Sequence, residues 1–225
     1  VDFFFKDRNE KITYICQQFV TGNIVSFDGV CDDESNVVFC DSNLFPPSVA
    51  DIVKENGDMF YYTAKEVPED LKEIGSKVIK AFNVKKRFFH LEFFRLTKAV
   101  KGVGKKNDLV ALETNMRPPG GYTPDLINFS QSVNSYQIYG DVMAFNENRQ
   151  DLSMKKFFAA CASRRDFVWY KHSDQEIFDR YHGKLCNYGH YPYVLSGAMG
   201  NKYFMAKFDT LEEVKEFQEF VEARN

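Results

Sequence analysis

Two strand-like segments joined by a short connection constrain the fold of this chain most strongly. Residues 87–98 and 108–117 are rich in apolar and β-forming side chains, and residues 100–107 between them include two glycines. Two such segments with a short glycine-containing connection predict an antiparallel β-hairpin. The expected turn lies at Gly102 and Val103, which sets the residue pairs that face each other across the hairpin.

The predicted hairpin places two carboxylates opposite each other. Its turn makes Glu92 and Glu113 direct cross-strand neighbours, although like charges in facing positions repel. Glu92 also lies within the aromatic run 88–94, where an isolated charge is costly. A divalent metal between the two carboxylates resolves both problems, and oxygen ligands of this kind suit Mg²⁺ or Mn²⁺. An ion pair of Glu92 with Arg87 or Arg95 is the alternative.

The second strand ends in a polar row that is followed by two prolines and two glycines. Alternate side chains of a strand share a face, so Glu113, Asn115 and Arg117 are expected in line. The guanidinium of Arg117 can donate two parallel hydrogen bonds to phosphate oxygens. The alternative for Arg117 is an ion pair with Asp125 that holds the following loop.

These residues resemble the C-terminal lobe of ATP-grasp enzymes, a superfamily that includes biotin carboxylase, the large subunit of carbamoyl-phosphate synthase and many carboxylate–amine ligases. The resemblance rests on His90-Leu91-Glu92-Phe93, the hairpin, and Glu113-Thr114-Asn115-Met116-Arg117 before Gly-Gly. It implies that Glu92 and Glu113 bridge Mg²⁺ ions and that Asn115 ligates one of them. It also implies that Arg117 binds ATP and is the catalytic residue that steadies the transferred phosphoryl group.

An upstream segment resembles the adenine hinge of the same family. Residues 14–22 read Tyr-Ile-Cys-Gln-Gln-Phe-Val-Thr-Gly. The resemblance implies that Gln17, Gln18, Phe19 and Val20 bind ATP, with main-chain contacts from the first and last of them. The family usually has Glu in this hinge, so the two glutamines favour a degenerate, non-catalytic binder as one alternative.

Two further polar residues near the proposed metal ligands are expected to have structural roles. His90 is expected to be a core residue or to support a ligand, because a lone histidine among apolar residues is seldom catalytic. Asp28 is expected on the surface of the sheet, with an approach to the substrate as the alternative.

The remaining pattern predicts an α+β fold, in which helices flank an antiparallel sheet. Residues 11–20 and 191–197 are expected to be strands. A helix is expected to begin near residue 67, where proline and acidic residues occupy its first turn. The capping box Thr210-Leu-Glu-Glu213 predicts a final helix.

The polar stretch 146–151 is the best internal boundary in the sequence. We therefore expect residues 1–148 to be the C-terminal part of an ATP-grasp domain and residues 149–225 to form a small α/β domain. The latter is also open to interpretation as a ligand-binding or dimerisation unit. Because the chain opens without methionine, we expect it to be a piece of a longer protein.

Charge and composition limit the classes of binding partner and the cellular compartment that we expect for this chain. The formal net charge of −3 argues against a bulk nucleic-acid binder, and no apolar run reaches the length of a membrane span. The five scattered cysteines fit reduced thiols in a cytoplasmic protein. We expect small-molecule carboxylate and amine substrates, and neither nucleic acid nor a membrane as partner. A homodimer is a possible oligomeric state.

The resemblance implies an ATP-dependent carboxylate–amine ligase with ATP and Mg²⁺ or Mn²⁺ as cofactors. Such an enzyme activates a carboxylate as an acyl-phosphate, which an amine or a similar nucleophile then attacks. Two alternatives stay open: phosphorylation of bicarbonate, as in biotin carboxylase and carbamoyl-phosphate synthase, and a nucleotide-binding module without turnover. The isolated chain is expected to be inactive, because the family's glycine-rich loop and phosphate-binding lysines are not found in it.

Overall fold

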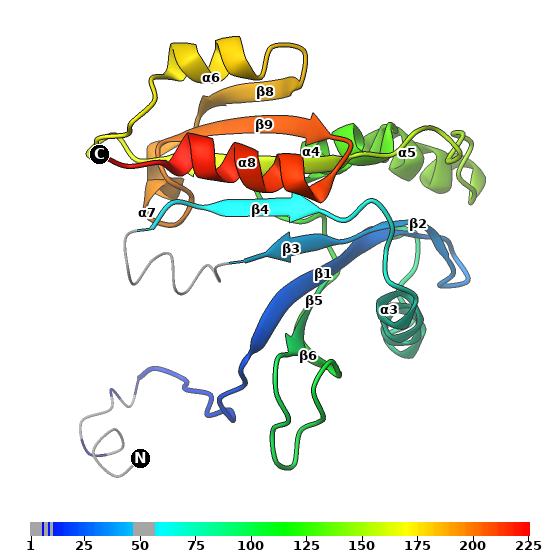
Figure 1. The fold of residues 1–225 in the computed structure, drawn as a ribbon. Coiled ribbons are helices and arrows are strands. Elements are labelled where there is room, and N and C mark those ends of the chain that lie inside the picture. Colours follow the sequence, from blue (N-terminus) through cyan, green and yellow to red (C-terminus); the bar gives the residue numbers. More distant parts are fainter. Residues whose placement is uncertain (1–5, 7–8, 10, 47–56) are drawn as a thin grey trace.

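One antiparallel sheet of nine strands organises the computed structural model, which describes residues 6, 9, 11–46 and 57–225 (Figure 1). The strand order is β6-β5-β1-β3-β4-β7-β9-β8, and β2 pairs with β1 beside that path. The strands are β1 (Gly22–Cys31), β2 (Val37–Asp41), β3 (Asn43–Phe45), β4 (Phe60–Thr63), β5 (Arg87–Leu96), β6 (Leu109–Asn115), β7 (Phe158–Arg164), β8 (Leu185–His190) and β9 (Lys202–Phe208).

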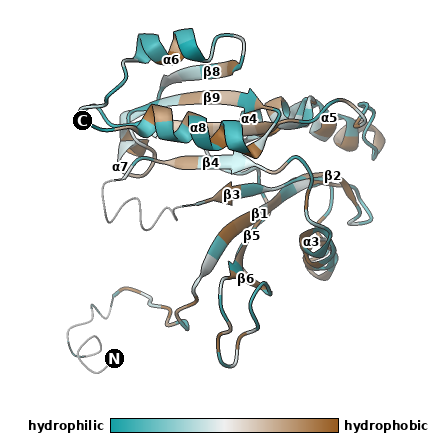
Figure 2. Cartoon of the chain, in the orientation of Figure 1, coloured by the Kyte–Doolittle hydropathy of each residue, from teal (hydrophilic) through white to brown (hydrophobic). Residues whose placement is uncertain are grey.

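Helices cover both faces of the sheet, so the predicted α+β class is confirmed. The helices are α3 (Glu69–Ala81), α4 (Thr123–Gln131), α5 (Ser135–Phe145), α6 (Asp174–Arg180), α7 (Ser196–Met199) and α8 (Leu211–Glu222), with a 3₁₀ turn at Tyr193–Leu195. Figure 2 shows hydrophobic residues along the strands β1 and β5 and many hydrophilic residues on the outward side of α6 and α8. This distribution is what amphipathic helices on a sheet require.

Each helix layer closes a separate part of the core. Helix α3 packs on the face of β1 and β5 that carries Phe27 and Leu91. Helices α4 and α5 lie on the opposite face, where Ile138 packs near Val30. Helices α6 and α8 bury the face of β7 and β9 that carries Ala160, while α4 covers the other side of these strands.

The sheet runs without interruption across the expected boundary near residue 148. Strand β4 pairs with β7, with Tyr61 opposite Cys161, and β7 then pairs with β9 and β9 with β8. Residues on both sides of the boundary therefore share one sheet. The division into residues 1–148 and 149–225 stays a prediction.

Two of the predicted strands are wrong. Residues 11–20 have no strand structure, and β1 begins only at Gly22. Residues 193–197 form the 3₁₀ turn and the start of α7. Pro192, with φ fixed at −52°, is the N-cap of that turn. The predicted C-terminal helix is confirmed, with both hydrogen bonds of the Thr210–Glu213 capping box present.

No helix among the described residues is both long enough and apolar enough to cross a lipid bilayer.

The close approach of α3 to the sheet depends on Gly75. A Cβ atom placed on Gly75 would lie 2.1 Å from the ring of Phe27. That ring is fully buried and stacks on Phe89 with 5.2 Å between ring centroids, so it has little room to move. The missing side chain therefore lets α3 lie directly on β1.

We expect Gly75→Ala to lower the free energy of unfolding by about 1–3 kcal/mol, the usual cost of overpacking a core. Gly140→Ala in α5 is the matched control, because nothing lies within 4 Å of a Cβ atom placed there. The control should be stabilising by about 0.5–1 kcal/mol, since alanine favours helix more than glycine does. Urea denaturation measures both variants, and equal effects would contradict the packing argument.

Candidate functional site

The β5–β6 hairpin pairs the two predicted carboxylates directly. Glu92 is the partner of Glu113, and His90 is the partner of Asn115, so the predicted pairing is confirmed at these positions. A β-bulge follows Glu92 and shifts the register, so that Phe93 pairs with Ala111. Side chains of directly paired residues in an antiparallel sheet lie on the same face. Glu92, Glu113 and Asn115 therefore share one face of the sheet.

Strand β1 adds further polar residues to that face. Ser26 is the β1 partner of Glu92, and Asp28 is the β1 partner of His90. The residues between them point to the opposite face, where Phe27 lies in the core under α3. The result is a polar face on β1, β5 and β6 that backs directly onto an apolar core. The residues of this face are Ser26, Asp28, His90, Glu92, Glu113 and Asn115.

Burial decreases along this face from β1 to β6. The side chain of Asp28 is 1% exposed, that of His90 is 9% exposed and that of Glu92 is 20% exposed. Glu113 is exposed and Asn115 is half-buried. The deep end is therefore fixed by protein contacts, whereas the β6 end is open to a ligand.

A chain of polar contacts links the deep end to Glu92. Asp28 Oδ1 lies 2.5 Å from His90 Nδ1, and His90 Nε2 lies 3.3 Å from Glu92 Oε1. Burial alone would lower the pKa of His90, but hydrogen bonds to Asp28 and Glu92 outweigh it and raise the pKa to about 10. A protonated imidazole between the two carboxylates therefore orients Glu92.

Asp28 is held from its other side by β1 and β3. Its Oδ2 atom accepts hydrogen bonds from Ser26 Oγ and from Asn43 Nδ2, the latter at 2.9 Å. The expectation that Asp28 lies on the sheet surface is wrong, because these partners and His90 bury it completely. The alternation of Ser26 and Asp28 with Val25 and Phe27 was the available sequence signal for this polar face.

The buried Asp41 lies beside Asp28, as its partner across β1 and β2. Burial raises the pKa of Asp41 well above its usual value, while the Ser42 amide and the Ser130 hydroxyl act in the opposite direction. The Ser42 amide donates to Asp41 Oδ1 at 2.7 Å, and Ser130 Oγ donates to Oδ2 at 3.2 Å. This network ties helix α4 to the polar face.

The proposed metal ligands come from the two neighbouring strands β5 and β6. Among the described residues, no group of three or more His, Cys, Asp or Glu side chains is arranged to hold a metal ion. The predicted set differs from such a group, since it has two carboxylates and an amide. Asn115 Nδ2 is buried without a hydrogen-bond partner. An amide nitrogen is a donor, so a cation would bind Asn115 through its Oδ1 atom. Two carboxylates and an amide oxygen are ligand types that suit a hard divalent cation.

Arg117 lies two residues beyond the end of β6 and is exposed. Its Nη1 donates to the carbonyl oxygen of Pro118 at 2.8 Å, which is different from the expected alternative of an ion pair with Asp125. The side chain of Asp125 instead hydrogen-bonds to Tyr136. The predicted role of Arg117 toward phosphate stays a prediction.

The alternative ion pair of Glu92 with Arg95 is wrong. The guanidinium of Arg95 pairs with Asp70 of α3, with 2.6 Å between Nη1 and Oδ2. Arg95 is on the opposite face of β5 from Glu92, since their positions differ by an odd number of residues.

The predicted hinge residues precede β1 as irregular, largely exposed chain. Gln17, Gln18 and Phe19 are exposed, Phe19 at 88%, and Val20 is half-buried. Gln18 Nε2 donates to the carbonyl oxygen of Lys101 at 3.3 Å, which brings the hinge beside the tip of the β5–β6 hairpin. Contact of these four residues with adenine stays a prediction.

Solved structures match the chain in three dimensions, whereas no protein-family model and no curated protein sequence matches it. Phosphoribosylglycinamide synthetase from Anaerococcus prevotii superposes with a TM-score of 0.60 and 12% identity, over 92% of this chain and 54% of that chain. The phosphoribosylaminoimidazole carboxylase ATPase subunit from Aquifex aeolicus gives a TM-score of 0.56 and 16% identity, over 90% of this chain and 59% of that chain.

A third similar structure is the biotin carboxylase domain of 2-oxoglutarate carboxylase from Hydrogenobacter thermophilus, solved as a dimer with MgADP, ADP and bicarbonate. Its TM-score is 0.56 at 12% identity, over 92% of this chain and 46% of that chain. The chain thus spans about half the length of the structures that it matches. These proteins are ATP-grasp enzymes, and their similarity together with the sheet, its register and its helix layers shows that this chain has the ATP-grasp fold.

Proposed function

We propose that this chain is the C-terminal half of an ATP-grasp ligase that uses Mg-ATP to activate a carboxylate as an acyl-phosphate. An amine or a similar nucleophile then attacks the acyl-phosphate. The observation that carries this proposal is the direct pairing of Glu92 with Glu113 beside Asn115, on the face that is open at β6. Two facing carboxylates repel each other, and His90 pairs with Glu92 of this couple, so a cation beside Glu113 would be favourable.

The residues of the polar face divide into proposed metal ligands and residues that orient them. Glu92 and Glu113 hold Mg²⁺, and Asn115 completes the donor set. When bound, Mg²⁺ neutralises charge on the phosphate oxygens during transfer. Asp28 and His90 fix the orientation of Glu92 from beneath, so that its carboxylate does not have to be ordered when the nucleotide binds.

Arg117 and the hinge complete the proposed nucleotide site. Arg117 would leave the carbonyl of Pro118 and donate to the transferred phosphoryl group, which its exposed position allows. The backbone of Gln17 and Val20 would contact the adenine edge. The bond from Gln18 to Lys101 supports this arrangement, because it holds the hinge near the hairpin that carries the metal ligands.

Phosphorylation of bicarbonate is the second candidate. It is favoured by the similarity to a biotin carboxylase domain that was solved with MgADP and bicarbonate. The same residues would hold Mg²⁺ and ATP in that reaction, and only the acceptor would differ. Measuring ATP turnover with bicarbonate and with small carboxylates, in the protein that carries the remaining lobes, distinguishes the two candidates.

The metal assignment predicts a selective loss of Mn²⁺ binding. We expect Glu113→Gln to weaken binding of Mn²⁺ in the presence of ATP at least about tenfold, since even supporting residues of metal sites contribute this much. Glu73→Gln is the matched control, because Glu73 is an exposed carboxylate on α3 that pairs with Lys77. Electron paramagnetic resonance measures free Mn²⁺ in each titration. Equal Mn²⁺ affinities in the two variants would remove Glu113 from the site.

The catalytic assignment predicts a loss of turnover without a loss of stability. In the protein with its remaining lobes, Arg117→Lys keeps the charge but loses the planar fork that fits two phosphate oxygens. We expect turnover to fall by roughly two to three orders of magnitude, as when one preorganised transition-state donor is removed. ATP affinity and the melting temperature should change little. Turnover within a few-fold of the unsubstituted protein would show that Arg117 is not catalytic.

A further inference from the structure

A short helical segment near the C-terminus lies against the loop that follows Arg117. This rim segment, residues 193–199, consists of the 3₁₀ turn Tyr193–Leu195 and helix α7. A Cβ atom placed on Gly121 would lie 3.5 Å from Met199 Cε, which is ordinary van der Waals contact. The rim segment therefore borders the end of the proposed nucleotide site at which Arg117 would hold the transferred phosphoryl group.

The backbone around the rim segment is held in place by the rest of the fold. Arg165 is buried and donates to the carbonyl oxygens of Ser196 at 3.1 Å and of Gly197 at 3.2 Å. Just before the rim segment, the rings of Tyr191 and Tyr122 stack with 5.8 Å between their centroids. The segment is thus fixed relative to the glycine loop without a ligand, which lowers the entropic cost of binding one.

The rim segment presents apolar side chains to solvent. Tyr193 is 88% exposed and Val194 is 86% exposed, and Leu195 is partly exposed beside them. Leu195 and Met199 are four residues apart in adjoining helical turns, so they lie on the same side of the segment. Contiguous exposed apolar side chains mark an interaction surface, whereas single ones do not.

The walls of this part of the site are uncharged apart from one cation. Residues 118–124 and 191–200 contain no charged side chain. Arg117 is exposed, and its Nη1 donates to the backbone of Pro118 rather than to a carboxylate. Apart from its chain neighbours, no described residue lies within 4 Å of a Cβ atom placed on Gly120. A ligand over Gly120 would therefore meet a guanidinium at one end and an uncharged, largely apolar wall at the other.

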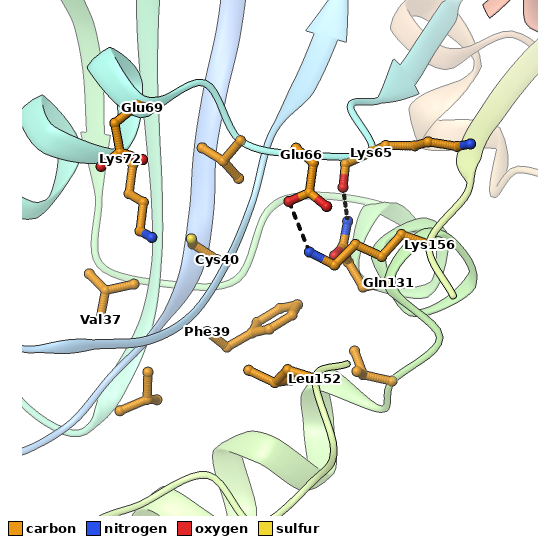
Figure 3. A pocket seen from close by; sticks show the side chains of 13 residues that line it. Val37, Phe39, Cys40, Lys65, Glu66, Glu69, Lys72, Gln131, Leu152 and Lys156 are labelled. Atoms are coloured by element: carbon orange, nitrogen blue, oxygen red, sulfur yellow. Dashed lines mark hydrogen bonds and ion pairs between the residues drawn. The ribbon is translucent and has the colours of Figure 1, made fainter. Parts of the chain in front are cut away.

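A cavity of about 300 Å³ beside β2 (Figure 3) is a separate hollow with no such polarity. Its lining includes Glu66 and Lys156, which pair with 3.0 Å between Oε2 and Nζ. It also includes Glu69 and Lys72, which are a carboxylate and an ammonium group of α3. The ammonium group of Lys65 is directed away, to a backbone carbonyl oxygen at 2.5 Å. The charges in this cavity balance, so it selects neither an anion nor a cation.

We propose that the rim segment binds the body of the carboxylate that the proposed ligase activates, and that this body is apolar and uncharged, as in an aryl- or alkyl-substituted acid. The carboxylate lies at Arg117, and the body lies over Gly120 against Leu195 and Met199. This inference rests on the proposed function, because that function supplies the carboxylate. It adds the class of acid that the site accepts.

The test uses 3-phenylpropionate as the probe and succinate as an acid whose body ends in a second charge. Each acid is titrated into the chain while methyl NMR signals of Val194, Leu195 and Met199 are recorded. We expect saturable shifts of these signals with 3-phenylpropionate and a Kd on the order of 1 mM, as for a small fragment. We expect none with succinate. Absence of shifts with 3-phenylpropionate, equal shifts with both acids, or shifts confined to other methyl groups would overturn the inference.

Matched leucine variants locate the body of the ligand. Leu195→Ser should raise the Kd of 3-phenylpropionate about fivefold to tenfold, because part of one leucine side chain loses its contact with the ligand. Leu152→Ser is the control, since Leu152 is 37% exposed, close to the 40% of Leu195, and lines the separate cavity beside β2. Equal Kd values in the two variants would remove the rim segment from the site.

Turnover separates this inference from the proposed function. In the protein with its remaining lobes, we expect ATP-dependent turnover of 3-phenylpropionate, with a KM that rises in Leu195→Ser. Turnover that prefers succinate would overturn the inference and leave the proposed ligase intact. Binding of 3-phenylpropionate at Leu195 without turnover of either acid would support the rim segment as a binding site and contradict the proposed function alone.

Discussion

The pairing of β5 with β1 on one side and with β6 on the other determines where the chemistry of this chain lies. One face of β5 carries Leu91 and Phe93, which pack under α3. A shift of one residue would move these side chains to the wrong face, so core packing fixes the register. That same register places Glu92 opposite Glu113 on the other face. Packing against α3 on one face of the sheet therefore fixes the alignment of the proposed metal ligands on the other face.

The polar face combines a rigid end with an open end. Asp28 is held by Ser26 and Asn43, and it holds His90, which in turn contacts Glu92. Removing one partner from such a buried network leaves another polar group unsatisfied, which makes the network mutually dependent. Toward β6 the burial decreases and Glu113 is exposed. This gradient fits a site in which the protein positions one carboxylate firmly and leaves room for a ligand beside the other.

Local features of this structure could be predicted from the sequence, whereas long-range pairings could not. The hairpin register followed from a short connection, and the final helix followed from its capping box. The pairing of β4 with β7 joins residues about a hundred positions apart, and no local pattern indicates it. Residues 11–20 have a strand-like composition, but composition does not supply a partner strand. The burial of Asp28 depends on Asn43 and His90, which reach it only after the sheet has formed.

Crystals grown with Mn²⁺ and a non-hydrolysable ATP analogue test the central claim most directly. Anomalous scattering locates manganese without reference to the protein chemistry around it. The account predicts a peak between the carboxylates of Glu92 and Glu113, with Asn115 close by and the phosphates of the analogue on the open side of β6. Manganese bound elsewhere, with Glu92 and Glu113 making no contact to it, would contradict the account.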